Sequence, residues 1–341
     1  MNLQLISQPI EFFPAAPVSR ETKGVLGGAL LGNQTDVTLP EWPVQRIFAP
    51  LLGSTAAVVQ ETWLACLPPV SGNDEGIAWC RVGNLLYGVI EMDETVFADS
   101  AVCSPLQAAS EEAYRRIFRL IEAQQLPHLW RVWNYLADIT GESHGLERYR
   151  QFNIGRQDAF LDFSRGATGN VPAACAIGLL EGPLSIAFMA GDQPAVPVEN
   201  PRQVSAYYYP TTYGPRSPTF SRAVLVYLPG QEILFISGTA SIVGHQTVHP
   251  DDVVGQCKEA LANVAAVVAE ANRLNRSSPY VLGEMSCRVY IRHAKDFPLV
   301  KETLIPLIGP ATEIVYVQAD ICRHDLLLEI EATASHMLGN C

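Results

Sequence analysis

Long apolar runs, a positive charge balance and closely spaced cysteines are all missing from this sequence of 341 residues. No run approaches the roughly 20 apolar residues that a membrane-spanning helix needs, so we expect no membrane contact. Lysine and arginine total 23 against 35 for aspartate and glutamate, which gives a net charge of −12. A nucleic-acid binder needs a basic surface to neutralise phosphates, so this balance argues against that class. Any anionic ligand must instead be held by local arginines.

The eight cysteines are scattered, and none forms a Cys-x-x-Cys pair. Most lie in apolar stretches, which is typical of reduced thiols in a cytoplasmic protein and argues against a disulfide framework or a zinc site. The first segment, MNLQLISQPIEFFP, has no basic region and no long apolar core, so we expect no signal peptide and a cytoplasmic location. The cysteines are Cys66, Cys80, Cys103, Cys175, Cys257, Cys287, Cys322 and Cys341.

Motifs for nucleotide binding and hydrolytic catalysis are missing too. GATGN and SGTAS are turns of small residues, with no Walker lysine and no GxGxxG pattern, and no GxSxG nucleophile elbow occurs. His245 and His249 are four residues apart, but Pro250 follows directly and no third ligand fits. We therefore expect no metal site.

The first 100 residues are rich in proline, glycine and short apolar runs, and are typical of strands and loops. Residues 104–126 predict the first strong helix, with Ser104 as N-cap and Pro105 at the first helical position. Its apolar face consists of Leu106, Ala109, Ala113, Ile117 and Leu120. A break at residues 140–145 suggests an amino-terminal α+β domain over 1–145 and a second domain over 146–341.

The second half predicts strands interspersed with two helices. Expected strands cover residues 182–191, 222–230, 231–239, 286–293, 313–321 and 326–334, and expected helices cover residues 250–274 and 296–304. Pro229-Gly230 predicts a hairpin between two of the strands. This order predicts an α+β fold in which helices pack on one face of mixed sheets.

Glu329 lies in an apolar strand, LLLEIEATA, where an ionised carboxylate is expensive. In an extended chain Leu328 and Ile330 share one face, while Glu329 and Glu331 share the other. Either that second face is solvated and Glu329 has no function, or the carboxyl is kept as a proton donor. Cys322 lies seven residues earlier, so its side chain meets Glu329 only if the intervening segment turns. Otherwise it is an ordinary buried thiol.

Two segments concentrate arginine and tyrosine. The first, ERYRQFNIGRQDAF, contains Arg148, Arg150 and Arg156 with Tyr149 and Asn153. The second, YYYPTTYGPRSPTFSRA, is broken by prolines and glycine, so it predicts a loop. Guanidinium groups bind carboxylates in bidentate fashion and tyrosine offers an apolar face with a polar tip, so the loop suits a ligand wall. An ordinary surface loop with scattered aromatics is the alternative. The second segment carries Tyr207, Tyr208, Tyr209, Tyr213 and Arg216.

Three carboxyl-terminal segments are LLLEIEATA, RVYIRHAKDF and the preceding helix QCKEALANVAAVVAEA. From about residue 230 onward they resemble the RidA (YjgF) imine-deaminase fold. RidA proteins place a carboxylate-binding arginine on the strand before the final Glu strand, but this chain has no arginine between His293 and Cys322.

Six further segments, spread over most of the chain, are WRVWNYLADI, YRQFNIGRQDAF, GNVPAACAIG, NPRQVSAYYYPTTYGPRSPTFSRA, SGTASIVGH and ADICRHDLLLEIEA. In this order they resemble the chorismatase family, and within it the hydroxybenzoate-forming members of the xanthomonadin pigment pathway.

The chorismatase resemblance implies cofactor-free cleavage of chorismate, with a RidA-like carboxyl-terminal half and an added amino-terminal domain. It implies that Glu329 is the catalytic acid and that Cys322 marks members that form a hydroxybenzoate. Ala240 is expected to lie opposite in the pocket and to influence the product. The expected partner is thus a small molecule, and the protein is expected to be a monomer or a small homo-oligomer. For binding the substrate we nominate Arg148, Asn153, Arg156, Tyr208, Tyr213 and Arg216.

The chemistry agrees with that role for Glu329. Cleaving an enol ether begins with protonation of its terminal carbon, so the acid must keep its proton near neutral pH. Apolar surroundings and the substrate's carboxylates both raise a glutamate pKa. The expected products are pyruvate with 3-hydroxybenzoate, 4-hydroxybenzoate or both. The alternatives are a chorismate hydrolase that makes a dihydroxycyclohexadiene carboxylate, a RidA-like imine deaminase, and a non-catalytic binder of aromatic carboxylates.

Overall fold

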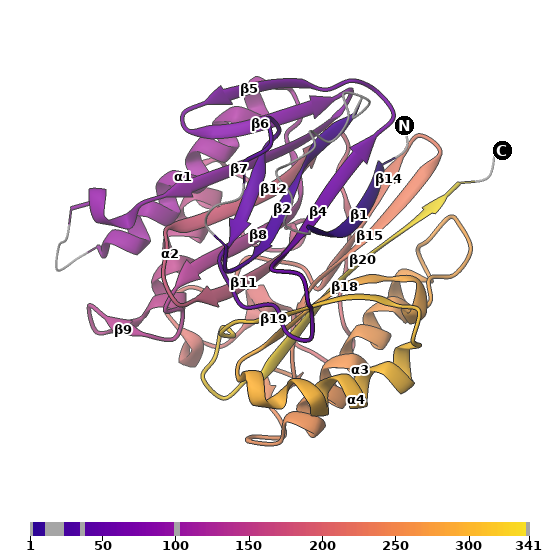
Figure 1. Ribbon diagram of the computed structural model, residues 1–341. Helices are drawn as coiled ribbons and strands as arrows, with labels where there is room; N and C mark the ends of the chain where they lie inside the picture. Colours follow the sequence, from indigo (N-terminus) through magenta and orange to yellow (C-terminus); the bar gives the residue numbers. More distant parts are fainter. Residues whose placement is uncertain (1–2, 11–23, 35–37, 99–102, 339–341) are drawn as a thin grey trace.

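The computed structural model describes residues 3–10, 24–34, 38–98 and 103–338, and Figure 1 shows their arrangement. Sheets occupy the middle of the molecule and the long helices lie outside them, with α1 and α2 on one side and α3 and α4 on the other. Helices thus cover one face of mixed sheets, and the predicted fold class is confirmed.

The first six-stranded sheet, called sheet C here, has the strand order β11-β8-β12-β7-β6-β5. Its outer face packs against α1 (Pro105–Ala123) and α2 (Arg148–Asp162). Ser104 caps α1 by accepting a hydrogen bond from the backbone N–H of Gln107, as predicted. The strands are β5 (Val70–Asp74), β6 (Ile77–Val82), β7 (Leu85–Met92), β8 (His128–Ala137), β11 (Ala173–Leu179) and β12 (Leu184–Gly191).

The second six-stranded sheet, called sheet B here, has the order β13-β14-β15-β20-β18-β19. Its outer face is covered by α3 (Val253–Ala271) and α4 (Phe297–Ile308). The hairpin predicted at Pro229-Gly230 is confirmed, and Gly230 takes the left-handed conformation the turn requires. The strands are β13 (Val196–Val198), β14 (Ala223–Leu228), β15 (Gln231–Thr239), β18 (Ser286–Ile291), β19 (Glu313–Gln318) and β20 (Leu328–Met337).

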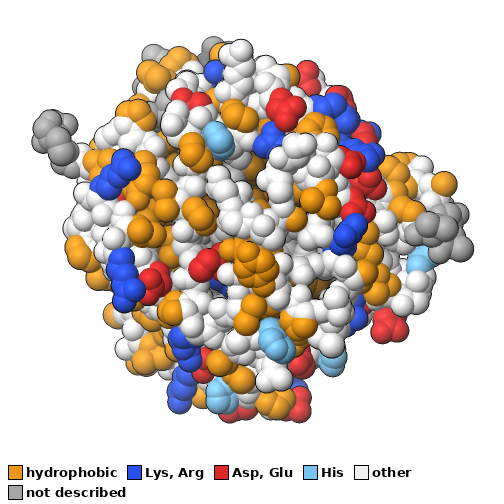
Figure 2. Space-filling view, turned by 180° about the vertical axis from the view of Figure 1, so that it is seen from behind, with side chains coloured by type: hydrophobic (Ala, Val, Ile, Leu, Met, Phe, Trp, Pro, Cys, Tyr) orange, Lys and Arg blue, Asp and Glu red, His pale blue; other side chains and the backbone are white. Residues whose placement is uncertain are grey.

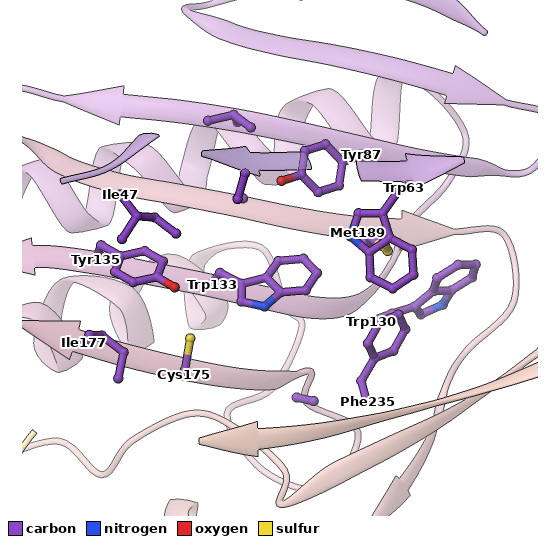
Figure 3. Close-up of a cluster of buried hydrophobic side chains, with 14 of the residues drawn as sticks. Ile47, Trp63, Tyr87, Trp130, Trp133, Tyr135, Cys175, Ile177, Met189 and Phe235 are labelled. Carbon is purple, nitrogen blue, oxygen red and sulfur yellow. The ribbon is translucent and has the colours of Figure 1, made fainter. Parts of the chain in front are cut away.

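A four-stranded sheet, sheet A, has the order β1-β4-β2-β3 and packs against the inner faces of the other two. Figure 3 shows the aromatic layer where the three sheets meet, with Trp63 from sheet A, Tyr87 and Trp133 from sheet C, and Phe235 from sheet B. Trp133 and Phe235 pack edge to face across this layer. The strands of sheet A are β1 (Leu3–Ile10), β2 (Val25–Gly32), β3 (Val44–Ile47) and β4 (Val58–Ala65).

Short elements fill the connections. Two small hairpins pair β9 (Glu142–Ser143) with β10 (Leu146–Glu147) and β16 (Ile242–Val243) with β17 (Gln246–Thr247). The 3-10 helices are η1 (Glu94–Val96), η2 (Ala206–Tyr208), η3 (Thr211–Tyr213), η4 (Leu282–Glu284) and η5 (Ala294–Asp296).

The edge strand β11 of sheet C is hydrogen-bonded to the segment that follows β19, an edge strand of sheet B. Gly178 of β11 and Asp320 exchange two backbone hydrogen bonds, of 2.8 and 2.9 Å. The chain after Asp320 then turns back before it enters β20. This link brings the turn before β20 beside β11.

The helix α2 was not among the predicted elements. Its buried face carries Gln151, Asn153 and Arg156 alongside Phe152, so the sequence shows no apolar stripe. Gly155 lets it approach α1 closely, because a Cβ there would lie 2.1 Å from the carbonyl oxygen of Gln107. Tertiary packing, rather than an amphipathic pattern, holds this helix in place.

One expected helix boundary differs from the structure, while the expected division into two domains stays a prediction. The helix expected from Pro250 begins at Val253, because Asp252 accepts a hydrogen bond from the backbone N–H of Gly255 and caps it. Sheet C continues past residue 145, because β11 and β12 pair with β8 and β7. The expected division between residues 145 and 146 therefore does not coincide with an edge of a sheet.

Candidate active site

A cavity of about 400 Å³ lies where β11, α2, the connection between β13 and β14, and the turn before β20 meet. A pocket of this size suits a small molecule. Its lining includes cationic, acidic, aromatic and sulfur-containing side chains. They are Glu147, Tyr149, Arg150, Arg156, Ala174, Cys175, Ala176, Tyr209, Tyr213, Pro218, Phe220, Arg222, Gly238, Ala240, Ile242, Gln246, Thr247, Cys322, Arg323, His324, Asp325 and Glu329.

Glu329 reaches the cavity from β20. Leu328 and Ile330 point into the apolar cluster under α3 and α4, so Glu329 and Glu331 point the other way, into the space between the sheets. Both are buried, each with 4% of its surface exposed, so the interpretation of a solvated second face is wrong.

The environment of Glu329 favours its neutral form. Burial is the largest cause that raises the pKa of Glu329, to about 8, and the neighbouring charge of Glu331 acts in the same direction. Arg131 and Arg222 oppose the rise. A carboxyl with such a pKa holds its proton at neutral pH and can donate it.

Gly238 makes room for this carboxyl group. A Cβ at residue 238 would lie 1.7 Å from Glu329 Oε1 and 2.6 Å from Glu329 Cδ. Real Cβ atoms do not approach other atoms so closely, so only glycine at this position of β15 is compatible with the observed position of the acid.

Cys322 joins Glu329 at the cavity because the chain turns between them. Arg323 to Asp325 form this turn, and the N–H of Leu326 donates to the Arg323 carbonyl at 3.2 Å. The turn that the odd spacing required is therefore present. Burial raises the pKa of the Cys322 thiol to about 12, with a further contribution from Glu329, so the thiol is neutral rather than a nucleophilic thiolate.

Two buried arginines line the cavity with spare hydrogen-bonding capacity. Arg156 has 2% of its surface exposed and donates to Asn153 Oδ1 at 2.7 Å. Arg222 has 4% exposed and donates to the Val204 carbonyl and the Tyr209 hydroxyl, both at 2.8 Å. All of these partners are neutral. Among the described residues, neither Nε has a hydrogen-bond partner, so both cations have donors available for an anion.

Arg323 and the tyrosines form another part of the wall. The Arg323 guanidinium lies 4.1 Å from the ring centroid of Tyr213 and 5.3 Å from that of Tyr209. It also donates to the His245 carbonyl at 2.9 Å. Tyr213 and His245 are themselves 3.3 Å apart, between the hydroxyl oxygen and Nδ1. These contacts tie the turn before β20 to the loop between β13 and β14.

The structure brings together Glu329, Cys322, Arg156, Tyr213 and Ala240 of the nominated residues, since all five line the cavity. Asn153 lies behind them, as the acceptor that orients Arg156.

The structure places three other nominated residues away from the described cavity lining. Arg148 forms an ion pair with Glu94 at 2.6 Å and donates to the Ala137 carbonyl. Arg216 has 45% of its side chain exposed and pairs with Asp158 at 3.1 Å. Tyr208 has 65% of its surface exposed. Their assignment as substrate ligands stays a prediction.

Sequence reasoning did not nominate Arg222 or Arg323, although both lie in segments that it singled out. Arg222 stands between Ser221 and Ala223 at the start of an apolar strand, and this position indicated burial more strongly than the proline-rich surroundings of Arg216 did. Arg323 directly follows Cys322. Cys175 and Phe220 carried no local signal, because they reach the cavity through sheet pairing and loop packing.

The described part of the chain bears on two further kinds of feature, metal centres and membrane-spanning helices. No group of three or more histidine, cysteine or acidic side chains there is arranged to hold a metal ion. His249 lies 3.8 Å from Glu259 instead. None of the described helices is long and apolar enough to cross a membrane.

The surface shown in Figure 2 carries acidic, basic and histidine side chains interspersed with apolar ones. With a net charge of −12, the molecule offers an anion little long-range attraction. Capture of an anion therefore depends on the arginines inside the cavity.

Comparison with known proteins gives consistent matches. The sequence model described as "Chorismatase FkbO/Hyg5-like, N-terminal" matches residues 61–190. A chorismatase of Streptomyces hygroscopicus is 38% identical over 277 residues, which cover 80% of this chain and 78% of that protein. A 3-hydroxybenzoate synthase of the same organism is 34% identical over 332 residues, which cover 92% of each chain.

The solved structures agree with this result. The crystal structure of a chorismatase matches with a TM-score of 0.84 and 33% identity, over 98% of both chains. A member of the YjgF/YER057c/UK114 family, Rv2704 of Mycobacterium tuberculosis, matches 34% of this chain and 85% of its own at a TM-score of 0.26, which is too low to support a conclusion.

Proposed function

Because the chain belongs to the chorismatase family, we propose that it cleaves chorismate to pyruvate and a hydroxybenzoate, as 3-hydroxybenzoate, 4-hydroxybenzoate or both. One observation carries this proposal. A buried carboxyl group that favours its protonated form shares a cavity with two buried guanidinium groups whose hydrogen-bond partners are neutral. The site thus offers a proton and two cations, which are what cleavage of a doubly negative enol ether requires.

Glu329 acts as the general acid. It protonates the terminal methylene carbon of the enolpyruvyl group, which becomes the methyl group of pyruvate. The pKa of about 8 keeps Glu329 protonated at pH 7, whereas an exposed glutamate would be almost fully ionised. Binding of a doubly negative substrate adds like-charge repulsion, which raises the pKa further.

Arg156 and Arg222 hold the two carboxylates of the substrate. Their unpartnered Nε–H groups supply charge-assisted hydrogen bonds, which are about twice as strong as neutral ones. Tyr213 and Tyr209 contact the ring, and Arg323, fixed on their faces, adds a third positive charge. The rigid attachment of these groups to α2, β14 and the turn before β20 orients the ether toward Glu329.

The reaction balances without water or a cofactor. After the methylene carbon gains its proton, the bond between the ring carbon and the ether oxygen breaks, and its electron pair moves to oxygen to form the carbonyl group of pyruvate. If the neighbouring ring hydroxyl stays in place, the ring loses one proton and becomes aromatic as 4-hydroxybenzoate. If that hydroxyl oxygen moves to the vacated ring carbon and its bond to the original carbon breaks, loss of one proton gives 3-hydroxybenzoate. In both cases the released proton restores Glu329. Hydrolysis to a dihydroxy diene would instead require a water molecule that adds to the oxocarbenium carbon and leaves the bond between the ring and the ether oxygen intact.

Cys322 favours aromatisation over hydrolysis. Its neutral thiol lines the cavity beside Glu329, with Ala240 and Ile242 also in the wall, and occupies space that an attacking water would need. The relative named 3-hydroxybenzoate synthase, which matches along 92% of this chain, supports a hydroxybenzoate product. We propose that these products enter pigment or ubiquinone biosynthesis. We also propose that the enzyme is cytoplasmic and acts as a monomer or small homo-oligomer.

The RidA-like imine deaminase is not favoured. The relatives that match most of the chain are chorismatases, and β19, the strand beside β18, contains no arginine between Glu313 and Gln318 to bind a carboxylate. A non-catalytic binder would not need an acid that keeps its proton at neutral pH.

The direct test is incubation of the purified protein with chorismate, without added metal or nucleotide. Pyruvate is followed by its coupled enzymatic reduction, and the aromatic products are resolved by chromatography. We expect equal amounts of pyruvate and hydroxybenzoate. Binding of chorismate without pyruvate release would overturn the catalytic proposal, and pyruvate with a non-aromatic diol would assign the chain to the hydrolases.

A further inference from the structure

A network of buried charged residues lies directly behind Glu329 and is separate from the groups that line the cavity. It joins all three large sheets: Glu61 comes from β4, Arg131 and Tyr135 from β8, Arg288 and Tyr290 from β18, and Glu331 from β20. All six side chains are buried. Buried charges are costly unless paired, so an arrangement that spans three sheets calls for an explanation.

Glu331 is the centre of this network. One of its oxygens accepts from Arg131 Nη2, and the other accepts from the Tyr290 hydroxyl at 3.0 Å and lies 3.3 Å from Arg288 Nη1. Arg288 also donates through Nε to both oxygens of Glu61 at 3.0 Å. Two guanidinium groups and a phenol surround the Glu331 carboxylate, whose negative charge acts on the neighbouring Glu329.

Glu331 and Glu329 lie two residues apart on the same face of β20. Opposite them on β18 lie Arg288, paired with Glu331, and Tyr290, paired with Glu329. The acid therefore faces a phenol, whereas its neighbour faces a guanidinium. Strand register therefore pairs Arg288 with Glu331 and places a neutral phenol opposite Glu329, while Arg131 donates its hydrogen bond to Glu331.

The remaining groups around the two carboxyls come from every neighbouring element. Figure 3 shows two of them, Tyr135 of β8 and Cys175 of β11, on neighbouring strands of sheet C. The titratable and charged groups near Glu331 or sharing the cavity with Glu329 include Glu61, Arg131, Tyr135, Glu147, Tyr149, Arg150, Arg156, Cys175, Tyr209, Tyr213, Arg222, Cys287, Arg288, Tyr290, Cys322, Arg323, His324 and Asp325.

We propose that Glu331 is a positioning residue for catalysis, which occupies Arg131 and presents a fixed negative charge so that Glu329 keeps its proton for the substrate. This role rests on the proposed function, because it matters only if Glu329 is the acid. It also explains why a charged cluster is retained where apolar packing would be cheaper.

Substitution of Glu331 and substitution of its ion-pair partner Arg131 should move the pKa of Glu329 in opposite directions. In Glu331→Gln, the negative charge is lost and Arg131 is left without its partner beside Glu329, so the ionised form of Glu329 is favoured. In Arg131→Gln, Glu331 loses one counter-charge and repels Glu329 more strongly, so the protonated form is favoured. General structural damage would not produce shifts of opposite sign.

The experiment is a pH profile of kcat for pyruvate release from chorismate in the wild type and both variants. Activity requires protonated Glu329, so it falls as the pH rises through the acid's pKa in the enzyme–substrate complex. We expect this alkaline limb to move down by about one pH unit or more in Glu331→Gln and up by a similar amount in Arg131→Gln. The double variant should lie between the two. Limbs that stay within about 0.3 units of the wild type, or move in the same direction, would overturn the proposal.

Glu232→Gln is the matched control. Glu232 is also a fully buried glutamate, but it accepts hydrogen bonds from the backbone N–H groups of Arg276 and Ser277, away from the cavity. We expect its alkaline limb to coincide with that of the wild type. A shift equal to that of Glu331→Gln would show that any buried charge change moves the limb, and would also overturn the proposal.

A second measurement covers the case in which the network variants do not fold. Infrared spectra of the wild type against pH should show a protonated carboxyl group at pH 7 that Glu329→Gln removes. If that band is absent at pH 7, the inference fails. The proposed function fails separately, if Glu329→Gln still releases pyruvate at the wild-type rate.

Discussion

Two neighbouring regions of the interior treat buried charge in opposite ways. Behind the cavity, Arg131, Arg288, Glu61 and Glu331 form a paired network in which each cation has a carboxylate partner. Around the cavity, the guanidinium groups of Arg156 and Arg222 donate to neutral partners, and both have an unpartnered Nε among the described residues. The charges of the paired region neutralise one another, whereas the cavity arginines keep hydrogen-bond donors without a partner among the described residues.

The difference teaches how to separate structural charge from functional charge. Burying an unpaired charge costs several kcal/mol, about the whole stability of many domains, unless something compensates. The paired network compensates internally. In the cavity, the free-energy cost of burying the guanidinium groups of Arg156 and Arg222 would be offset when a carboxylate binds. Substitutions in the first region should therefore lower stability, with Glu331 and Arg131 also moving the pH profile of Glu329, whereas substitutions in the second should act on catalysis alone.

The largest expected effect is on the acid itself. Glu329→Gln keeps the shape of the side chain but removes the transferable proton, so pyruvate release should fall by roughly 10²- to 10⁴-fold. Coupled pyruvate assays measure the loss, and circular dichroism checks the fold. A variant that retained wild-type turnover would show that another group protonates the substrate.

Substitutions in the paired region should lower the free energy of unfolding. Glu61→Gln removes the carboxylate that accepts from Arg288, and breaking a buried pair in this way costs about 3–5 kcal/mol. Urea denaturation measures the change. Arg156→Met is the comparison from the cavity, since loss of a cation without a recorded ionic partner should cost less than about 1 kcal/mol. Equal losses in the two variants would remove the distinction between the regions.

Substitution of a cavity arginine should lower kcat/KM for chorismate. Arg222→Met removes a carboxylate anchor, and we expect kcat/KM for chorismate to fall by roughly 30-fold or more, as for loss of a charged hydrogen-bonded partner. Arg216→Met serves as its matched variant, because an exposed pair such as Arg216–Asp158 contributes only about 0–1 kcal/mol. A larger loss for Arg216→Met than for Arg222→Met would favour the residue nominated from sequence.

The smallest expected effect concerns product choice. Cys322→Ala removes a neutral thiol and opens space beside Glu329, so the rate should change by less than about tenfold, while the product mixture shifts between the hydroxybenzoates or toward the diene diol. Chromatography of the products measures the ratio. An unchanged ratio would leave Cys322 with a packing role.

Local rules predicted a large part of the fold. Ser104 with Pro105 marked the start of α1, and Pro229-Gly230 marked the turn between β14 and β15, because caps and turns depend on residues close in sequence. The same rules missed α2, whose buried face carries Gln151, Asn153 and Arg156. Its partners lie on α1 and around the cavity, so nothing local marked it as a helix.

Within the candidate site, the prediction drawn from the local pattern alone was that of the acid, where a single strand carried the signal. A glutamate within LLLEIEATA indicated an unusual carboxyl group, and its alternation with Leu328 and Ile330 gave the correct face. Which arginines would lie near it depended on the pairing of β11, β15 and β20 and on the turn at Arg323, which no spacing in the sequence reveals. Arg216 was therefore nominated and Arg222 was not, although they are six residues apart.

Because residue 238 is glycine, redesign of this enzyme is restricted at that position. Even one added carbon at Gly238 would occupy the place of the acid's oxygen, while Ala240, two residues further along the chain, faces the same cavity from the wall. Libraries intended to alter which isomer is made should therefore vary residue 240 and leave residue 238 as glycine.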